Sequence, residues 1–411
     1  MTTSSSPAQR APSPDVIVVG GGIGGLSSAY ALASAGRQVR VLEQSPAFGE
    51  LGAGLQLGPN ATRILREWGL LDEVTAAGVR PRRLVLRDAL DGSELTHLDL
   101  GRDFLSRYGA PYVVIHRSDL LDILYRACQR AGVDLVTSAR VLRVETGADS
   151  AAAVTDTAVH GGALVLAADG LWSTLRASFS HDEPICSGYV AYRGAIPLSD
   201  AADLGELSLE DVVVYFGPGC HFVQYPLRQG DLLNQVAVFA SPAFARGAED
   251  WGGPDELEAV FSRCCAQVRS GTAKLERERR WPMFDRLPVS NWVQGRLALT
   301  GDAAHPMLQY LAQGACQAIE DAWTLSMHAP PRGSDGPDEW QEALVSYEKL
   351  RTERTAQVQT TARAWGDLWH CDGLTRALRN ELLRDRNPAD YKHIDWLYGK
   401  AVACGLVNLP V

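Results

Sequence analysis

The stretch that decides the fold is residues 15–25, Asp-Val-Ile-Val-Val-Gly-Gly-Gly-Ile-Gly-Gly. Its four apolar β-branched residues, 16–19, predict a short buried strand. Gly20, Gly22 and Gly25 follow in the spacing G-x-G-x-x-G, and a helical pattern comes directly after them. In this strand–turn–helix context the glycines predict a loop that holds the pyrophosphate of a dinucleotide.

The residues that follow the glycines support this interpretation. Ile23 opens a run of apolar residues at helical spacing, and residues 39–42 read as a second strand, so the segment is a βαβ unit. The start of such a helix offers free N–H groups and positive charge to phosphates. Glu43 ends the second strand, where an acid accepts hydrogen bonds from a ribose. The fingerprint alone does not distinguish NAD from FAD.

The bulk composition favours a small-molecule ligand. Among 411 residues, 39 Lys and Arg against 49 Asp and Glu give a net charge of −10, which argues against binding a polyanion such as nucleic acid. The eight cysteines form no C-x-x-C pair and share no metal-ligand spacing with histidines, so we expect reduced thiols and no metal. Residues 1–14 lack the apolar core of a signal peptide, and no apolar run approaches the ~20 residues of a membrane span, so we expect a cytoplasmic protein.

Two further motifs follow the fingerprint. Residues 168–173 read Ala-Asp-Gly-Leu-Trp-Ser, with Arg176 shortly after, and residues 301–306 read Gly-Asp-Ala-Ala-His-Pro. With the glycine fingerprint, and in this order, they resemble the single-component flavoprotein aromatic hydroxylases typified by para-hydroxybenzoate hydroxylase and salicylate hydroxylase. The resemblance covers nearly the whole chain and implies FAD as the bound cofactor. No second G-x-G-x-x-G is present, which argues against a separate nicotinamide domain. The resemblance implies that NADH or NADPH docks transiently.

The resemblance also implies the fold. We expect an α/β protein whose Rossmann-like FAD-binding domain, of the para-hydroxybenzoate hydroxylase type, carries an inserted antiparallel β-sheet substrate domain and C-terminal helices. The expected division is a disordered tail at 1–14, the FAD-binding domain at 15–187 and 286–330, the substrate-binding sheet at 188–285 and a helical region at 331–411. A homodimer is expected because related enzymes commonly form one.

The family also implies which residues hold the flavin. Asp302 would hold the ribityl chain, Asp169 would contact FAD and the nicotinamide nucleotide, and Arg117 would reach the flavin phosphates. The segment Gly52-Ala53-Gly54 would run beside the isoalloxazine ring, where missing side chains let a planar ring lie against backbone. A helix beginning near Gly314 and Ala315 would direct its positive end at the flavin pyrimidine edge. Each of these residues has the alternative of an ordinary turn or a solvated charge.

Within the family, three side chains most resemble those of the 3-hydroxybenzoate 6-hydroxylases. They are His221 and Tyr225, at i and i+4 on a predicted strand, and Gln309 in residues 309–316. The resemblance implies a flavin C4a-hydroperoxide that hydroxylates 3-hydroxybenzoate, para to its hydroxyl, to 2,5-dihydroxybenzoate (gentisate). His221 would take the phenol proton, since an imidazole titrates near ~6.5, and Gln309 would orient the hydroxyl.

Several alternatives stay open at this point. His221 and Tyr225 could be ordinary sheet residues, and His305 is a rival base whose position favours a structural role. Arg193 and Arg228 are both candidates for binding the substrate carboxylate. The substrate could be salicylate, a hydroxynicotinate or a larger phenolic metabolite, because Met307-Leu308 departs from the expected small hydroxyl pair. A non-catalytic flavin-binding module is the distant alternative.

Overall fold

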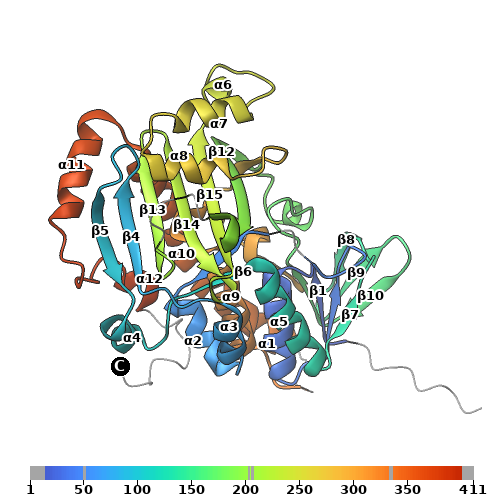
Figure 1. The fold of residues 1–411 in the computed structure, drawn as a ribbon. Helices are drawn as coiled ribbons and strands as arrows, with labels where there is room; N and C mark the ends of the chain where they lie inside the picture. The colour runs from blue at the N-terminus through green and yellow to red at the C-terminus, as the bar shows by residue number, and fades with distance from the viewer. Residues whose placement is uncertain (1–13, 50–51, 202–203, 205–207, 333–336, 400–411) are drawn as a thin grey trace, which may run out of the picture.

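The computed structural model describes residues 14–49, 52–201, 204, 208–332 and 337–399. The tail predicted at 1–14 therefore lies outside the described residues except for Pro14, as does Cys404. The other seven cysteines carry free thiols. The fold is the predicted α/β arrangement, with a mainly parallel sheet beside a larger sheet and helices packed on both (Figure 1).

The glycine fingerprint lies in a six-stranded sheet of order β17-β18-β11-β1-β2-β7. Strand β1 (Val16–Val19) pairs in parallel with β2 (Val39–Leu42) on one side and with β11 (Leu164–Ala167) on the other. Strand β18 (Leu297–Leu299) pairs in parallel with β11. Two segments almost three hundred residues apart therefore share one sheet. The edge strands are β7 (Asp134–Val136) and β17 (Val293–Gln294).

Three helices pack around this sheet and share its core. They are α1 (Ile23–Ser34), α5 (Arg117–Arg130) and α9 (Gly314–His328). Helix α1 packs between the other two, so the helix that follows the fingerprint touches the helix that follows the Gly-Asp motif. A three-stranded sheet of β8 (Val141–Thr146), β9 (Ala151–Thr155) and β10 (Val159–Gly162) flanks this region.

The second sheet has seven strands in the order β16-β12-β15-β14-β13-β4-β5. Five of them come from the predicted insertion and pair antiparallel: β12 (Ile185–Pro197), β13 (Asp211–Gly217), β14 (Cys220–Leu227), β15 (Leu232–Ala240) and β16 (Trp281–Asp285). The other two, β4 (Arg83–Asp88) and β5 (Glu94–Asp99), come from within the range expected for the first domain. Because β4 joins β13 in parallel, the sheet is mixed rather than purely antiparallel.

Alternation along β14 gives the two faces of this sheet different roles. Phe222 packs toward α7 (Pro254–Phe261) and α8 (Ala266–Ala273), which cover the outer face (Figure 1). Val223 and Tyr225 face the other way, toward α10 (Pro337–His370), because side chains of a strand alternate between faces. The inner face therefore packs against α10.

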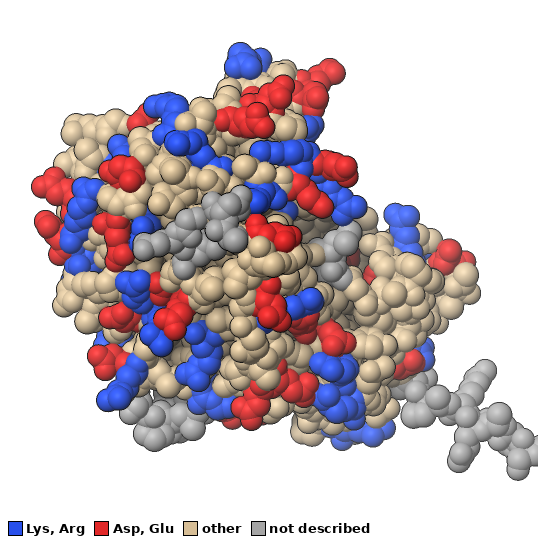
Figure 2. Space-filling view, in the orientation of Figure 1, with Lys and Arg blue, Asp and Glu red and all other residues tan. Residues whose placement is uncertain are grey.

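The remaining elements connect or cover these layers. They are β3 (Gly54–Leu57), β6 (Val113–His116), α2 (Pro59–Glu67), α3 (Leu71–Ala77), α4 (Arg102–Tyr108), α6 (Pro242–Ala245), α11 (Gly373–Arg384), α12 (Asp395–Tyr398) and the short 3₁₀ turns η1 (Leu175–Ser178), η2 (Leu198–Ala201), η3 (Arg228–Gly230), η4 (Gly301–Ala303) and η5 (Gln309–Leu311). Of the helices within the described ranges, none combines the length and apolar character required to span a bilayer. Basic and acidic side chains are interspersed over the face seen in Figure 2.

Candidate active site

The β1–α1 turn has the geometry of a phosphate cradle. Gly20 has a positive φ of 107°, and a Cβ there would lie 2.4 Å from the carbonyl oxygen of Ala168. A Cβ on Gly25 would lie 1.9 Å from the carbonyl oxygen of Gly20, so the helix can pack this closely only with glycine. At Gly22 a Cβ would meet no described atom within 4 Å, and no side chain caps α1. The helix start is therefore open to a phosphate group.

The predicted ribose acid lies beside this turn. One carboxylate oxygen of Glu43 accepts a hydrogen bond of 2.7 Å from the Gly21 amide, and the other accepts one of 2.8 Å from the Ser45 amide. These bonds hold the carboxylate next to the glycine loop at the end of β2. Its position fits the expected contact with a ribose.

The Asp-Gly motif joins the two halves of the cofactor region. One carboxylate oxygen of Asp169 accepts from the backbone amides of residues 174 and 175, while the other is buried without a partner among the described atoms. Burial raises the pKa of Asp169. Arg176 is fully buried and donates to the carbonyl oxygens of Ala303 and Ala304, at 2.8 and 2.6 Å. It thereby ties this motif to the Gly-Asp segment.

A buried ionic network holds the Gly-Asp segment against α9. Asp321 accepts from the Gly301 amide at 2.9 Å, from His305 at 2.6 Å and from Arg351 at 2.7 Å. Burial alone would raise the pKa of Asp321, but His305 and Arg351 bring it down to about 2. His305 is fully buried in this network and does not line the cavity, which favours the structural role over that of a base. Asp302 is exposed next to the fixed Gly301, and the α9 start at Gly314 follows.

One cavity of about 1510 Å³ joins the cofactor region to the inner face of the second sheet. Of the predicted site residues, Gly22, Ile23, Gly52, Ala53, Gly54, Arg117, His221, Tyr225, Asp302, Gln309, Gly314 and Ala315 line it. Four others, Gly20, Gly25, Glu43 and Asp169, do not, although Ala168 and Gly170 beside Asp169 do. The structure therefore brings the flavin motifs and all three predicted catalytic residues to one space.

The segment at 52–54 lies between the flavin motifs and the predicted catalytic residues. Its glycines are needed for contacts that the sequence did not predict. A Cβ on Gly54 would lie 2.5 Å from the ring of Tyr225, and one on Gly52 would lie 2.8 Å from the Arg117 side chain. The Gly54 amide also donates to the Asn234 side chain at 2.7 Å. Protein side chains, rather than open space for a flavin ring, thus occupy the room left by these two glycines.

His221 is paired with a second histidine that sequence reasoning missed. Its Nδ1 lies 2.8 Å from Nε2 of His370, the last residue of α10, and the two rings stack with centroids 5.1 Å apart. Burial lowers the pKa of His221 well below 6.5, and the neighbouring His370 and Arg193 lower it further. Burial lowers the pKa of His370 to about 3, helped by Arg379. Both imidazoles are therefore neutral at physiological pH.

Of the two arginines left open, only Arg193 lies in the cavity. Its Nη2 donates a 2.8 Å hydrogen bond to Oε1 of Gln309, and its Nε is buried without a partner among the described atoms. Burial lowers the pKa of Arg193, as does the nearby Arg117. Arg228 is instead paired with Asp119, at 2.8 Å, outside the cavity. A cation in the cavity favours an anionic ligand.

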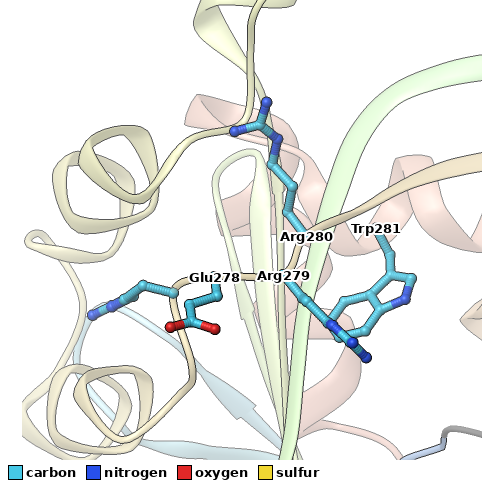
Figure 3. Close-up of a pocket in the computed structure, with 5 residues that line it drawn as sticks. Glu278, Arg279, Arg280 and Trp281 are labelled. Atoms are coloured by element: carbon cyan, nitrogen blue, oxygen red, sulfur yellow. The ribbon is translucent and has the colours of Figure 1, made fainter.

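A smaller hollow of about 580 Å³ adjoins the rim of the cavity at residues 277–281. Arg279 and Trp281 line both spaces. Arg280 extends away from the side chains of Arg279 and Trp281, as Figure 3 shows, and pairs with Asp250. The rim of the cavity thus carries an exposed cation and an indole.

Known proteins share this architecture. Residues 13–362 match the family described as "FAD binding domain". A 3-hydroxybenzoate 6-hydroxylase of Polaromonas naphthalenivorans is 38% identical over 93% of this chain and 95% of its own, and a 3-amino-4-hydroxybenzoate 2-monooxygenase of Streptomyces cremeus is 37% identical over 94% and 95%. The structure of Klebsiella pneumoniae HpxO complexed with FAD and uric acid superimposes with a TM-score of 0.80 at 26% identity, covering 94% of this chain and 96% of that one.

The cofactor region fits FAD, the group that the family binds. It has an uncapped helix start, no room for a side chain at Gly20 and Gly25, and an acid at the end of β2. The family match covers most of the chain, and the two enzyme relatives align over nearly its full length. The chain belongs to the FAD-binding domain family and is one of its FAD-dependent, single-component aromatic monooxygenases.

Proposed function

We propose that the protein hydroxylates a phenolic aromatic acid with NAD(P)H and O₂, and that this acid is 3-hydroxybenzoate, converted to 2,5-dihydroxybenzoate. The observation that carries the proposal is the meeting of a neutral His221, Gln309 and Arg193 on the wall of a cavity shared with the flavin motifs. The Polaromonas relative at 38% identity carries the name of this activity.

When bound, FAD would supply the redox chemistry, which is hydride uptake from NAD(P)H and activation of oxygen. The glycine turn and the start of α1 would hold its phosphates, and Glu43 its ribose. Asp302, Arg117 and the segment at 52–54 would hold the rest of the molecule. The start of α9, which has no side-chain cap, directs its partial positive charge at the cavity and stabilises negative charge there.

The protein's own residues would activate the ring by removing the phenol proton. His221 lines the cavity, and its Nδ1 is engaged by His370, so Nε2 is the atom that accepts this proton. Gln309 has its Oε1 held by Arg193, which leaves the amide N–H₂ to donate to the phenolate oxygen. An electron-rich phenolate ring attacks an electrophilic oxygen faster than a phenol does. Tyr225, on the same face of β14, would position the ring.

Arg193 gives the site its preference for an acid. A partly desolvated guanidinium attracts the carboxylate or the phenolate of the substrate, and it lowers the cost of forming the anion. Residues 15–187 and 286–330 would then serve the cofactor, and residues 188–285 together with strands β4 and β5 would serve the substrate. Transient docking of the nicotinamide nucleotide and a homodimer remain predictions.

The test is product identification. Purified protein is expected to be yellow with FAD, and with NADH, air and 3-hydroxybenzoate it is expected to release 2,5-dihydroxybenzoate, identified by chromatography and mass spectrometry. The Streptomyces relative hydroxylates a different phenolic acid according to its name, so 3-amino-4-hydroxybenzoate, salicylate and 6-hydroxynicotinate belong in the same panel. A hydroxylated product from one of these alone would reassign the substrate. A folded protein that stays colourless in excess FAD would refute the function.

A further inference from the structure

The imidazole pair joins the cavity to a site behind it. His221 lies on β14 and lines the cavity, whereas His370 ends α10 and does not. The two rings are nearly parallel, with an interplanar angle of 19°, and their nitrogens are 2.8 Å apart. His221 has 1% of its surface exposed and His370 has 7%. Both rings are therefore buried, with His221 at the cavity wall and His370 behind it.

The surroundings hold His370 in place. Its ring stacks on Tyr189 of β12 with centroids 4.5 Å apart, and the edge of Tyr310 in η5 meets it at 5.4 Å. The His370 carbonyl oxygen accepts a 2.9 Å hydrogen bond from the Gly219 amide, directly before β14. The charged group that faces His370 is Arg379 of α11, and the one that faces His221 is Arg193 of β12. Among the described residues, no carboxylate is hydrogen-bonded to either ring.

Two neutral imidazoles that share one hydrogen bond can exist in two arrangements. In the first, His221 carries its proton on Nδ1 and donates to Nε2 of His370, so the His221 Nε2 that faces the cavity has a free lone pair. In the second, His370 donates, and the His221 Nε2 carries the proton. Only the first arrangement can accept a proton from a phenol in the cavity.

We propose that His370 is a positioning residue that holds His221 in its Nδ1–H tautomer and takes over the proton removed from the substrate. The inference rests on the proposed function. The phenol O–H bond breaks as an N–H bond forms at Nε2 of His221. The proton on Nδ1 of His221 moves to Nε2 of His370, and His370 releases its own Nδ1 proton to water. The low pKa of His370 favours this release, because the protonated ring does not persist in its buried position.

The test compares two substitutions of His370. His370→Gln keeps a carbonyl oxygen that can accept from His221, whereas His370→Leu removes the acceptor. In His370→Leu, FAD content is expected to stay near wild type, while hydroxylated product per NAD(P)H consumed falls about 10-fold or more. The pKa of enzyme-bound 3-hydroxybenzoate, followed by its ultraviolet absorbance against pH, is expected to rise by about one unit or more. His370→Gln can hold the tautomer but cannot take up the proton, so it is expected to recover only part of both losses.

The control is His328→Gln, at the end of α9, a histidine that does not line the cavity. A His370→Leu protein with wild-type product yield and phenol pKa would overturn the inference. If His221→Ala also left both unchanged, the proposed function itself would fail, whereas a loss confined to His221→Ala would remove only the role of His370.

If His370→Leu does not bind FAD, ¹⁵N NMR of histidine-labelled wild-type protein decides. The Nδ1–H tautomer of His221 supports the inference and the Nε2–H tautomer overturns it.

Discussion

The ring of Tyr225 occupies the space that a side chain on Gly54 would need: a Cβ on Gly54 would lie 2.5 Å from Cε2 of the tyrosine ring and 2.6 Å from its hydroxyl oxygen. The glycine lies on β3, in the segment expected beside the flavin, and the tyrosine lies on β14 of the substrate sheet. The lack of a side chain at residue 54 is therefore what allows the two halves of the site to meet.

Gly54→Ala is expected to push Tyr225 out of position, because two ring carbons and the hydroxyl oxygen of the tyrosine lie within 2.8 Å of the new methyl group. The KM for the aromatic acid should rise about 10-fold, with FAD still bound, as measured by steady-state kinetics and flavin absorbance. Gly161→Ala is the matched control, since a Cβ there would meet no described atom within 4 Å. Unchanged kinetics in Gly54→Ala would show that Tyr225 does not position the substrate.

His221→Ala and Gln309→Ala should each retain FAD and lose most hydroxylation. Removing a general base typically costs about 10²- to 10⁴-fold in rate, and loss of Gln309 removes the donor to the phenolate oxygen. NAD(P)H oxidation is expected to continue with release of hydrogen peroxide instead of product, which a peroxidase-linked assay measures. Full hydroxylation by both variants would mean that the phenol is activated by other groups.

The histidine pair should make the protein sensitive to acid. A histidine whose pKa is depressed on folding binds a proton more readily when unfolded, so its neutral form favours folding above about pH 6.5. That contribution is lost as pH falls from 6.5 toward the folded value of about 3 for His370. Each such proton changes the free energy of unfolding by about 1.4 kcal/mol per pH unit.

His370→Gln is therefore expected to flatten the dependence of unfolding free energy on pH between 6.5 and 4.5, measured by denaturant titration. Glu320 and Asp321, whose pKa values are held near 2, take up protons on unfolding mainly at the lower end of this window and below it, and they do so equally in both proteins. The exposed His181→Gln is the control and should leave the slope unchanged. An unaltered slope in His370→Gln would show that His370 is not neutral in the fold.

Arg351→Leu should cost about 3–5 kcal/mol of stability, because it removes a cation that two buried carboxylates share. Arg351 lies 2.6 Å from Glu320 and 2.7 Å from Asp321, and all three are fully buried. FAD affinity should fall as well, since Asp321 also holds the Gly301 amide. Arg143→Leu, which breaks an exposed pair with Glu145, should change stability by less than about 1 kcal/mol in the same denaturant titration.

Local sequence patterns predict the part of this structure that is built from neighbouring residues. Strand β1, its glycine turn and helix α1 are adjacent in sequence, so hydrophobic period and turn chemistry predict them directly. Strands β4 and β5 could not be assigned to the second sheet, because parallel pairing of β4 with β13 joins residues about 130 positions apart. The sequence did not indicate His370 as a site residue, because its contact with the site also joins positions far apart in the chain. It closes a helix notable for its tryptophans, and only the fold brings it across 149 positions to His221.

Arg193 is expected to determine both substrate binding and turnover. Arg228, which lies outside the cavity, provides a matched control. Arg193→Met removes the cavity cation and releases Oε1 of Gln309, so the amide can turn and present the wrong atom to the phenolate. A hydrogen bond to a charged group contributes about 1.5–3 kcal/mol, so kcat/KM for the acid should fall about 10- to 100-fold. Arg193→Lys restores the charge but not the fork geometry that reaches Gln309, and should recover binding more than turnover. Arg228→Met, which loses only the pair with Asp119, should keep wild-type kinetics. If the two methionine variants behaved alike, the cavity cation would have no part in recognising the acid.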